Sequence, residues 1–394
     1  ESGHKLLTLG GPVKVIVDTD IGRDMDDSWA LAFMLGRRDL FDIQMILTAT
    51  FDTAGKAQIV AKNLHAAGRT DVSIGIGLPT ASNSSGPLPG CRVGPMYPWA
   101  STYNLTSYPG ELFRDGVAQM ASIISAVPDA LILELAPATN MLSLHKRFPA
   151  LDTSRVKYFA MGGSIRKGYL NRSLIEPEYN IFTDLEAAKA VFNSSYDQAY
   201  DHLRWSQFVD APLDTSGIIQ LYGSEYELLL QAKEQGNRIL QALFDAYHIW
   251  CKCPNNFVIS LSDCDMAYNG CFQNHTIALL AYTPENSSTT LYDVQPTIMA
   301  AASLVADSGL PPIESMMHIE KMTLAVDSFS LTVPSYSSYG IGFKGGTTVS
   351  AATAWTSPNG MDAGGLLLFK SALVRSLATH DARSHADKPE YSLV

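Results

Sequence analysis

Short apolar runs and amphipathic segments alternate along the first half of the chain, and this alternation constrains the fold more than any other feature. Residues 13–18 form an apolar, β-branched run, and residues 27–37 then place apolar side chains at helical spacing. Repeated alternation of this kind is typical of parallel strands joined by crossover helices. We therefore expect an α/β protein with an open, mostly parallel sheet and helices on both faces.

The same patterns extend the prediction along the chain. Strands are expected at residues 43–48, 73–77, 130–135, 156–161 and near 206–210, and helices at 55–67, 112–126, 139–148, 185–192, 226–251, 293–306 and 364–379. Residues 318–327 indicate one strand of an added small hairpin, and the aperiodic residues 78–110 indicate a lid or binding loop. Since no Gly-, Ser- or Pro-rich linker divides the chain, we expect one domain over residues 1–394 with extra C-terminal helices.

Composition narrows the class of protein. The 394 residues are 46% hydrophobic and 17% charged, which excludes a disordered or fibrous chain. With 28 Lys and Arg against 39 Asp and Glu, the net charge is −11 and argues against nucleic-acid binding. No apolar run approaches the roughly 18 residues that a membrane span needs. We expect no nucleic-acid partner and no membrane insertion.

Cysteine spacing and glycosylation sequons point to the extracellular space. Four of the five cysteines fall within residues 251–271, a spacing that fits two local disulfides, with Cys91 free, better than a zinc site. Sequons of the form Asn-x-Ser/Thr occur at Asn83, Asn104, Asn171, Asn193, Asn274 and Asn286. The sequence also starts without Met or an apolar leader, as a mature secreted protein would. We expect a secreted glycoprotein.

An acidic run follows the first predicted strand. Five carboxylates lie within residues 18–27, where the buried strand turns into a helix: Asp18, Asp20, Asp24, Asp26 and Asp27. Packed together they would repel one another unless a cation neutralised them, and calcium prefers six to eight oxygen ligands of this type. A helix N-terminus that attracts acidic residues would account for Asp26 and Asp27, but not for Asp18 and Asp20. The run also lacks the closing Glu of an EF-hand, so we expect a different metal site.

Three ordered motifs resemble one protein family. Residues 18–27 resemble the N-terminal signature of the calcium-dependent nucleoside hydrolases, the inosine–uridine-preferring family. Residues 135–140 resemble that family's Gly-Pro-Leu-Thr-Asn turn, and Met-Gly-Gly at 161–163 followed by the segment 178–188 resembles its Glu-Phe-Asn motif. The matches keep their order over roughly residues 13–310. A lone acidic run would be a weak signal, but three signatures at predicted strand ends are specific.

The resemblance implies an α/β fold, one bound calcium ion, and hydrolysis of the N-glycosidic bond of ribonucleosides. It implies that the calcium ligands are Asp20, Asp27, the main-chain carbonyl of Leu135, and Asp293. Asp20 would also act as the general base for the attacking water, because the cation raises the acidity of that water. The implied sugar contacts are Asp26, Met161, Glu178 and Asn180, with Asp18 supporting the cluster from behind.

Structural roles compete with several of these assignments. Glu178 and Asn180 could cap a helix together with Asp184, and Asp293 could be an N-cap. Met161 could pack in the core by default. Asp24 is read as solvated loop charge.

The sequence departs from the family pattern at four places. The acidic run is two residues longer than usual, around Arg23. Asp52 stands where the family usually has a substrate-binding Asn, and an Asp offers acceptors without an amide donor.

Tyr292 replaces a His that acts on the leaving base, and a phenol is a poor acid near pH 7. Leaving-group help could instead come from stacking on Trp250, which could equally be core, whereas His248 and His275 are weaker alternatives. Asn171 is the nearest match to a sugar-binding Asn, but an occupied sequon there would exclude it from a pocket.

These patterns leave three hypotheses. The first is a secreted, calcium-dependent ribonucleoside hydrolase that acts on a small-molecule purine or pyrimidine nucleoside. This hydrolase could form a homo-oligomer. The second is a relative that binds calcium and a ribose-like ligand without turnover, suggested by Asp52 and Tyr292. The third is a hydrolase of another N-ribosyl substrate, suggested by the loop at 78–110.

Overall fold

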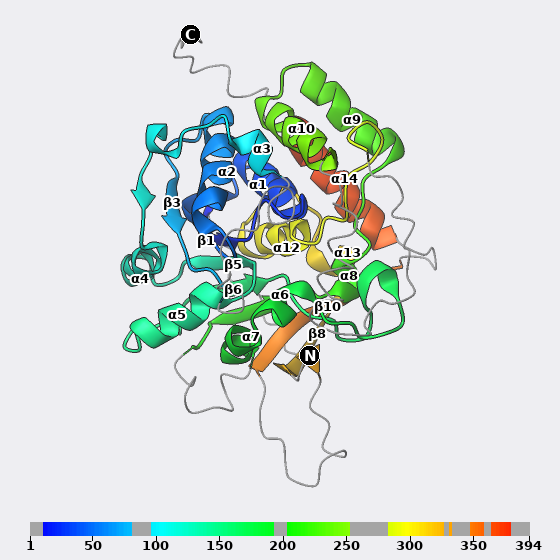
Figure 1. The fold of residues 1–394 in the computed structure, drawn as a ribbon. Helices are drawn as coiled ribbons and strands as arrows, with labels where there is room; N and C mark the ends of the chain where they lie inside the picture. Colours follow the sequence, from blue (N-terminus) through cyan, green and yellow to red (C-terminus); the bar gives the residue numbers. More distant parts are fainter. Residues whose placement is uncertain are drawn as a thin grey trace.

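The computed structural model describes residues 11–80, 96–192, 203–252, 283–326, 331–332, 347–357 and 364–379. In this part of the chain ten strands form one sheet in the order β4-β3-β2-β1-β5-β6-β7-β10-β8-β9 (Figure 1). They are β1 (Val13–Thr19), β2 (Phe41–Thr48), β3 (Ser73–Ile76), β4 (Leu112–Phe113), β5 (Leu131–Leu135), β6 (Lys157–Ala160), β7 (Gln207–Asp210), β8 (Met317–Val326), β9 (Leu331–Thr332) and β10 (Thr347–Trp355). Every pairing from β4 to β10 is parallel, whereas β8 pairs antiparallel with both β10 and β9.

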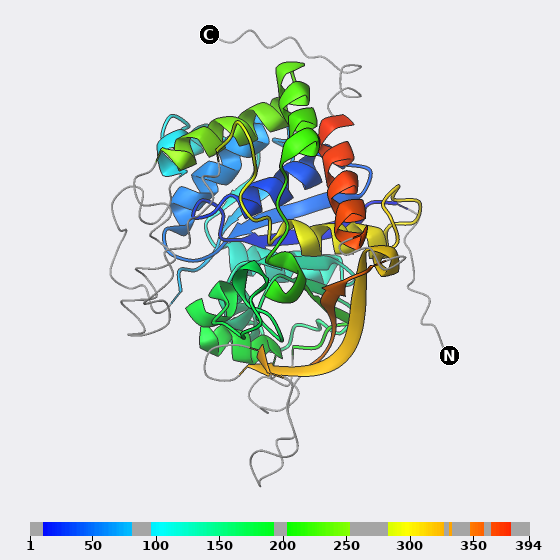
Figure 2. The same cartoon turned by 90° about the vertical axis from the view of Figure 1, so that its right-hand side faces the viewer.

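Helices cover both faces of the sheet, as predicted (Figures 1 and 2). One face carries α1 (Asp26–Gly36), α2 (Thr53–Ala66), α9 (Gly223–Glu234), α10 (Arg238–Cys251), α12 (Val294–Leu304) and α14 (Gly364–Thr379). The other face carries α4 (Gly116–Ala126), α5 (Thr139–Arg147) and α7 (Leu185–Phe192). Along β1, Val15 and Val17 point to the first face and Ile16 to the second, because successive strand residues alternate in direction. None of the described helices is long and apolar enough to cross a membrane.

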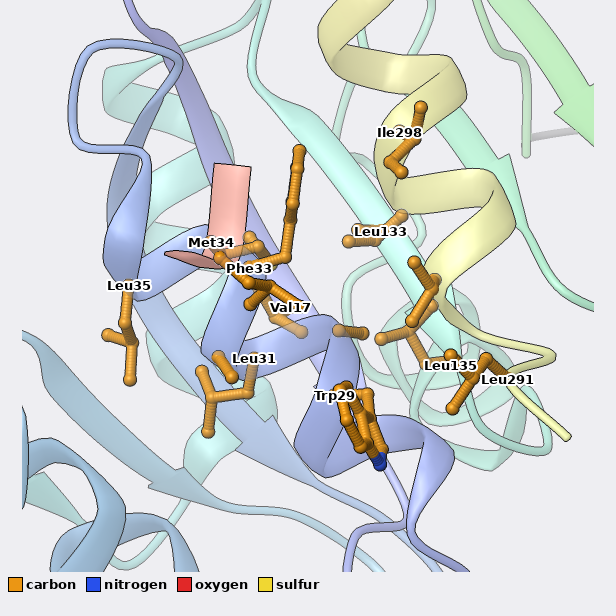
Figure 3. Close-up of a cluster of buried hydrophobic side chains, with 14 of the residues drawn as sticks. Val17, Trp29, Leu31, Phe33, Met34, Leu35, Leu133, Leu135, Leu291 and Ile298 are labelled. Atoms are coloured by element: carbon orange, nitrogen blue, oxygen red, sulfur yellow. The ribbon is translucent and has the colours of Figure 1, made fainter. Parts of the chain in front are cut away.

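A buried apolar cluster fixes where α1 and α12 meet the central strands (Figure 3). Trp29 of α1, Leu135 at the end of β5 and Leu291 just before α12 belong to this cluster, and each is at most 2% exposed. Burying a large apolar side chain stabilises the fold by roughly 1.5–3 kcal/mol, so this contact holds the start of α1 against the start of α12. Two segments that are far apart in sequence therefore meet at the carboxyl ends of the strands.

The structure corrects one predicted helix. The long helix expected at residues 226–251 is two helices, α9 and α10. Gly236 between them has a φ of +97°, and the Asn237 side chain accepts a hydrogen bond from the Leu240 amide at 3.0 Å to begin α10. Glycine tolerates such a φ and asparagine is a preferred N-cap, so a Gly-Asn pair outweighed the continuous helical spacing.

Two further differences concern strands. The segment expected to be helical at residues 112–126 opens with the short strand β4, and the helix begins at Gly116, capped by Asp115. The predicted hairpin strand at 318–327 is confirmed as β8. The sequence reading missed β10, which joins that hairpin to β7 and so extends the main sheet.

Candidate active site

Three buried carboxylates converge at the carboxyl end of the central strands. Asp26 and Asp27 begin α1, and Asp293 immediately precedes α12. Their side chains are 8%, 2% and 2% exposed, and one oxygen of each lies within 4.8 Å of the others. We call these three residues the acidic triad. Carboxylate oxygens this close suit a hard divalent cation, so the residues present fit a calcium site.

Burial and mutual repulsion act together on the acidic triad. Burial is the largest cause that raises the pKa of all three carboxyls well above the usual range of aspartate. The neighbouring carboxylates raise these pKa values further: Asp20 acts on all three residues, and Asp24 acts on Asp26 and Asp293. A bound cation would reverse this effect, since it favours the ionised form. A hydrogen bond from the Thr19 hydroxyl to Asp27 fixes one triad carboxylate.

Asp20 is held beside the triad by a buried lysine that the sequence reading did not single out. Lys56 of α2 is fully buried, and its ammonium donates to the main-chain carbonyl of Asp20 at 2.7 Å and to the Thr50 hydroxyl at 2.6 Å. Burial lowers the pKa of Lys56 to about 8, although the carboxylates of Asp20 and Asp27 oppose that shift. Lys56 thereby joins the loops that follow β1 and β2.

Leu135 ends β5, and Asp18 lies next to the last residue of β1. Leu135 lies in register with Thr19 in the neighbouring strand, which places its main chain one residue from Asp20. The Asp18 carboxylate accepts a hydrogen bond from the Asn140 side chain at 2.9 Å. Burial is the main reason that the pKa of Asp18 rises to about 7. Asp18 therefore supports β1 from within the core.

Glu178, Asn180 and Met161 form a second group at the same edge of the sheet. Glu178 begins the short helix α6 (Tyr179–Thr183), and its carboxylate accepts three main-chain hydrogen bonds, from Gly163, Asn180 and Ile181, at 2.8–3.1 Å. The Asn180 amide donates to the Met161 carbonyl at 3.1 Å. Burial raises the pKa of Glu178 to about 7, and the Asp20 carboxylate adds to that rise. The capping role is thus real, and it coexists with a position close to Asp20.

The remaining candidate residues have local structural partners. Asp52 caps α2 by accepting from the Gly55 amide at 2.9 Å. Asn171 is exposed and accepts from the Lys167 ammonium at 2.6 Å. Trp250 is 6% exposed, and its indole N–H donates to the Arg23 carbonyl at 2.9 Å. Substrate contacts by these three residues stay predictions.

Several predicted features lie partly or wholly outside the described residues. Among the sequons, Asn104, Asn171 and Asn286 are described and exposed, whereas Asn83, Asn193 and Asn274 are not described. Three of the four cysteines in the disulfide prediction, Cys253, Cys264 and Cys271, are likewise outside, as are Cys91, which was expected to be free, and His275. His248 contacts the Phe244 carbonyl and the Glu285 carboxylate.

The structure also reveals charged groups that pattern reading missed. Glu134 and Asp210 are buried carboxyls within apolar strands, at 2% and 0% exposure. A charged residue inside an apolar strand was the sequence signal that could have predicted them. Arg23 lies over the rings of Phe51 and Tyr179, with its guanidinium carbon 5.6 and 4.7 Å from their centroids. No sequence signal predicted that arrangement, because the two rings come from distant segments.

Comparisons with known proteins agree with this fold. No curated protein sequence matches the chain closely enough to be called a relative. A plant nucleoside hydrolase superposes with a TM-score of 0.62 at 18% identity, covering 93% of this chain and 99% of that one. A purine-preferring ribonucleoside hydrolase from Gardnerella vaginalis gives 0.56 at 15% identity, covering 93% and 99%. A type III effector protein complexed with adenosine diphosphate ribose gives 0.58 at 14% identity, covering 95% and 96%. Identities this low demonstrate a shared fold alone.

The family model is more specific than these superpositions. The model of the inosine-uridine preferring nucleoside hydrolases matches residues 15–295. The matched segment contains the acidic run after β1, the capped Glu178 at the start of α6, and Asp293 before α12. The chain belongs to the inosine-uridine preferring nucleoside hydrolase family.

Proposed function

We propose that this protein hydrolyses the N-glycosidic bond of ribonucleosides in a calcium-dependent reaction, releasing ribose and the free base. The observation that carries the proposal is the convergence of Asp26, Asp27 and Asp293 beside Asp20, in a chain of this family. Cleavage of an N-glycosidic bond by water develops positive charge on the ribose, as in glycoside hydrolysis generally. Carboxylates arranged around the sugar stabilise that charge.

We propose a role for each site residue. Asp27, Asp293, Asp20 and the Leu135 carbonyl would hold calcium, which would orient the ribose diol and raise the acidity of a bound water. Asp20 accepts the proton of the attacking water, and Lys56 holds the main chain of Asp20 in place. Asp26, Glu178 and Asn180 bind sugar hydroxyls, and Met161 packs beneath the ring.

The first experiment measures free base by chromatography from inosine, adenosine, guanosine, uridine and cytidine, with calcium and with a chelator. We expect base release that the chelator abolishes and calcium restores. Asp20→Asn should abolish turnover, whereas Asp129→Asn, at an exposed carboxylate in the turn before β5, should not change it. Unchanged activity in Asp20→Asn would refute the proposed general base.

A second candidate is a relative that binds a ribose-containing ligand without turnover. Two observations favour it: Tyr292 stands beside Asp293 in place of a stronger acid, and a protein of this fold has been solved with adenosine diphosphate ribose. Calorimetric binding of nucleosides or of adenosine diphosphate ribose, with no base released over hours, would support this candidate and refute the hydrolase.

The extracellular location is proposed on the sequons. Those that are described, at Asn104, Asn171 and Asn286, have exposed side chains, as a glycan requires. Glycosidase treatment of protein secreted by eukaryotic cells should lower its apparent mass. An unchanged mass would argue against a glycoprotein.

A further inference from the structure

The loop that joins β1 to α1 carries part of the acidic run, and other segments of the chain hold its main chain. We call residues 20–25 the acidic loop. The main-chain carbonyls of Asp20, Gly22 and Arg23 each accept a hydrogen bond from outside the loop. The donors belong to α2, to the residue just before α3 (Tyr97–Ala100), and to α10. Elements that are distant in sequence therefore hold the chain between Asp20 and the start of α1.

Trp250 of α10 contacts the acidic loop through its polar edge. Its indole N–H donates to the Arg23 carbonyl at 2.9 Å, and the side chain is 6% exposed. The ring packs in the core, with its centroid 5.9 Å from that of the Tyr247 ring. Because a buried N–H without an acceptor is unfavourable, the core position of the indole also fixes the position of the Arg23 main chain.

Gly22 forms the turn of the acidic loop. Its φ is +110°, which glycine adopts without strain. A Cβ there would lie 2.6 Å from the Ile59 side chain of α2 and 3.7 Å from the Tyr97 ring, so the turn packs closely against both. The Met96 amide donates to the Gly22 carbonyl at 3.4 Å. The Tyr97 hydroxyl donates to the Asp52 carbonyl at 3.1 Å and so joins α3 to the start of α2.

The acidic loop needs such support because the charges around it oppose one another. The Asp20 and Asp24 carboxylates both repel Asp26, and all three repel Asp293. A loop that was free to move would spread these carboxylates apart, and gathering them around a cation would then cost conformational entropy. The hydrogen bonds to the loop carbonyls do not involve the carboxylates, so they restrain the loop and leave its charges available to a cation.

Building on the proposed calcium-dependent function, we infer that Trp250 is a positioning residue for the cation: it holds the acidic loop so that the carboxylates at the start of α1 stay converged. The indole reaches the main chain at Arg23, three residues before Asp26, the first residue of the helix. Residues that orient metal ligands from behind typically contribute about 10- to 100-fold to metal affinity. Since Lys56 separately holds the Asp20 main chain, the effect of Trp250 falls on the triad more than on the proposed general base.

This role differs from stacking on the leaving base. A stacking ring needs a face that the ligand can reach, whereas the Trp250 ring is buried and contacts the loop with its N–H edge. Loss of a stacking contact would change KM or kcat and leave calcium binding as it is. The two roles therefore predict different results in a calcium titration.

The test measures calcium affinity directly. Isothermal titration calorimetry of the full-length, chelator-treated protein gives the calcium dissociation constant of wild type and of Trp250→Phe. The matched control is Trp355→Phe, because the Trp355 indole on β10 also donates to a main-chain carbonyl, that of Thr215, at 3.1 Å. Thermal melting of the chelated variants confirms that each is folded.

We expect Trp250→Phe to raise the calcium dissociation constant by about 10- to 100-fold, whereas Trp355→Phe should match wild type. At saturating calcium, the kcat of Trp250→Phe on a ribonucleoside should approach the wild-type value, because Lys56 still holds Asp20. A wild-type calcium dissociation constant in Trp250→Phe, or an equal rise in Trp355→Phe, would overturn the inference.

A second variant tests the restraint of the acidic loop without changing Trp250. Gly22→Ala strains the turn, because φ is +110° and the new Cβ would meet Ile59 at 2.6 Å. It should also raise the calcium dissociation constant. Gly236→Ala, which has a positive φ in open space between α9 and α10, is the control and should not. Wild-type calcium affinity in Gly22→Ala would contradict the restraint.

The measurements also separate this inference from the proposed function. If wild type binds calcium and releases base while Trp250→Phe keeps full calcium affinity, only the role of Trp250 is refuted. If wild type binds calcium but releases no base, the hydrolase is refuted, and weaker calcium binding by Trp250→Phe would still support the positioning role. If wild type does not bind calcium, both are refuted.

Discussion

Two groups of buried carboxyls share the same burial penalty but have different surroundings. The acidic triad of Asp26, Asp27 and Asp293 converges at the strand ends, whereas Asp18 and Glu134 face each other across β1 and β5 and Asp210 lies on β7, all within the sheet. Burial raises the pKa in both groups.

The difference between the groups lies in what surrounds each carboxyl. Triad oxygens face one another within 4.8 Å, so one cation can serve all three. Neither oxygen of Asp210 has a hydrogen-bond partner among the described residues. Convergence allows a single cation to neutralise several buried charges, whereas a buried carboxyl that no cation reaches is a cost to stability.

The largest expected effect comes from breaking the triad. Asp27→Asn removes the charge of a proposed calcium ligand and should lower kcat/KM by about 100-fold or more, since even residues behind metal ligands cost 10- to 100-fold. Calcium at about 100 times its dissociation constant should stabilise wild type by about 2.7 kcal/mol. Calorimetric melting with and without calcium checks this: an Asp27→Asn protein that keeps the full calcium effect would contradict the triad assignment.

The next effect is the pH dependence of the free energy of unfolding, to which the carboxyls of both groups contribute. A carboxyl whose pKa is raised in the folded state binds more protons folded than unfolded, so the free energy of unfolding falls as pH rises between the two pKa values. For Asp18 this interval runs from 3.8 to about 7. Each such carboxyl contributes a slope of at most about 1.4 kcal/mol per pH unit.

Calcium should change only part of that slope. Metal binding favours the ionised triad, so it should remove the triad's share and leave the share of Asp18 and Asp210. Urea unfolding between pH 5 and 8, with chelator and with calcium, tests both points. A chelated protein that became more stable as pH rose would contradict the raised pKa values.

A smaller gain should come from removing an isolated core carboxyl. Asp210→Val replaces a fully buried acid in a strand with an apolar, β-branched residue, and should raise stability at pH 8 by about 1–3 kcal/mol. The gain should shrink as pH falls, because the raised pKa favours the protonated acid, which is cheaper to bury. Calcium should stabilise Asp210→Val as much as it stabilises wild type. Lower stability of the variant at pH 8 would indicate that Asp210 has a partner.

The smallest expected effect comes from a backbone change far from both groups of carboxyls, and it serves as a reference for the other effects. Gly236→Ala places a Cβ where no atom lies within 4 Å but where φ is +97°, so it tests backbone strain alone. The expected loss is about 1–2 kcal/mol, independent of calcium. Gly11→Ala, also in open space but without a positive φ, is the matched control and should change little. Equal effects of the two changes would refute the strain argument.

Local sequence patterns predicted much of the fold and only part of the site. The strand at residues 13–18 and the helix at residues 364–379 were predicted correctly, because a buried strand and an amphipathic helix each have their own apolar pattern. The break at Gly236 was missed because apolar spacing continues across it. The strand β10 was missed because its role depends on β7, which lies far away in sequence.

The sequence by itself determined that acidic groups follow β1 and that the chain forms a parallel sheet, because both are properties of contiguous residues. Only the tertiary structure decided which distant groups meet them. Packing of Leu291 against the core brings Asp293 to Asp27, and α2 brings the Lys56 ammonium to the Asp20 carbonyl. Arg23 likewise lies against the Phe51 and Tyr179 rings, which other segments supply. The local sequence sets which side chains are charged, whereas the distances between the charged groups depend on how the whole core packs.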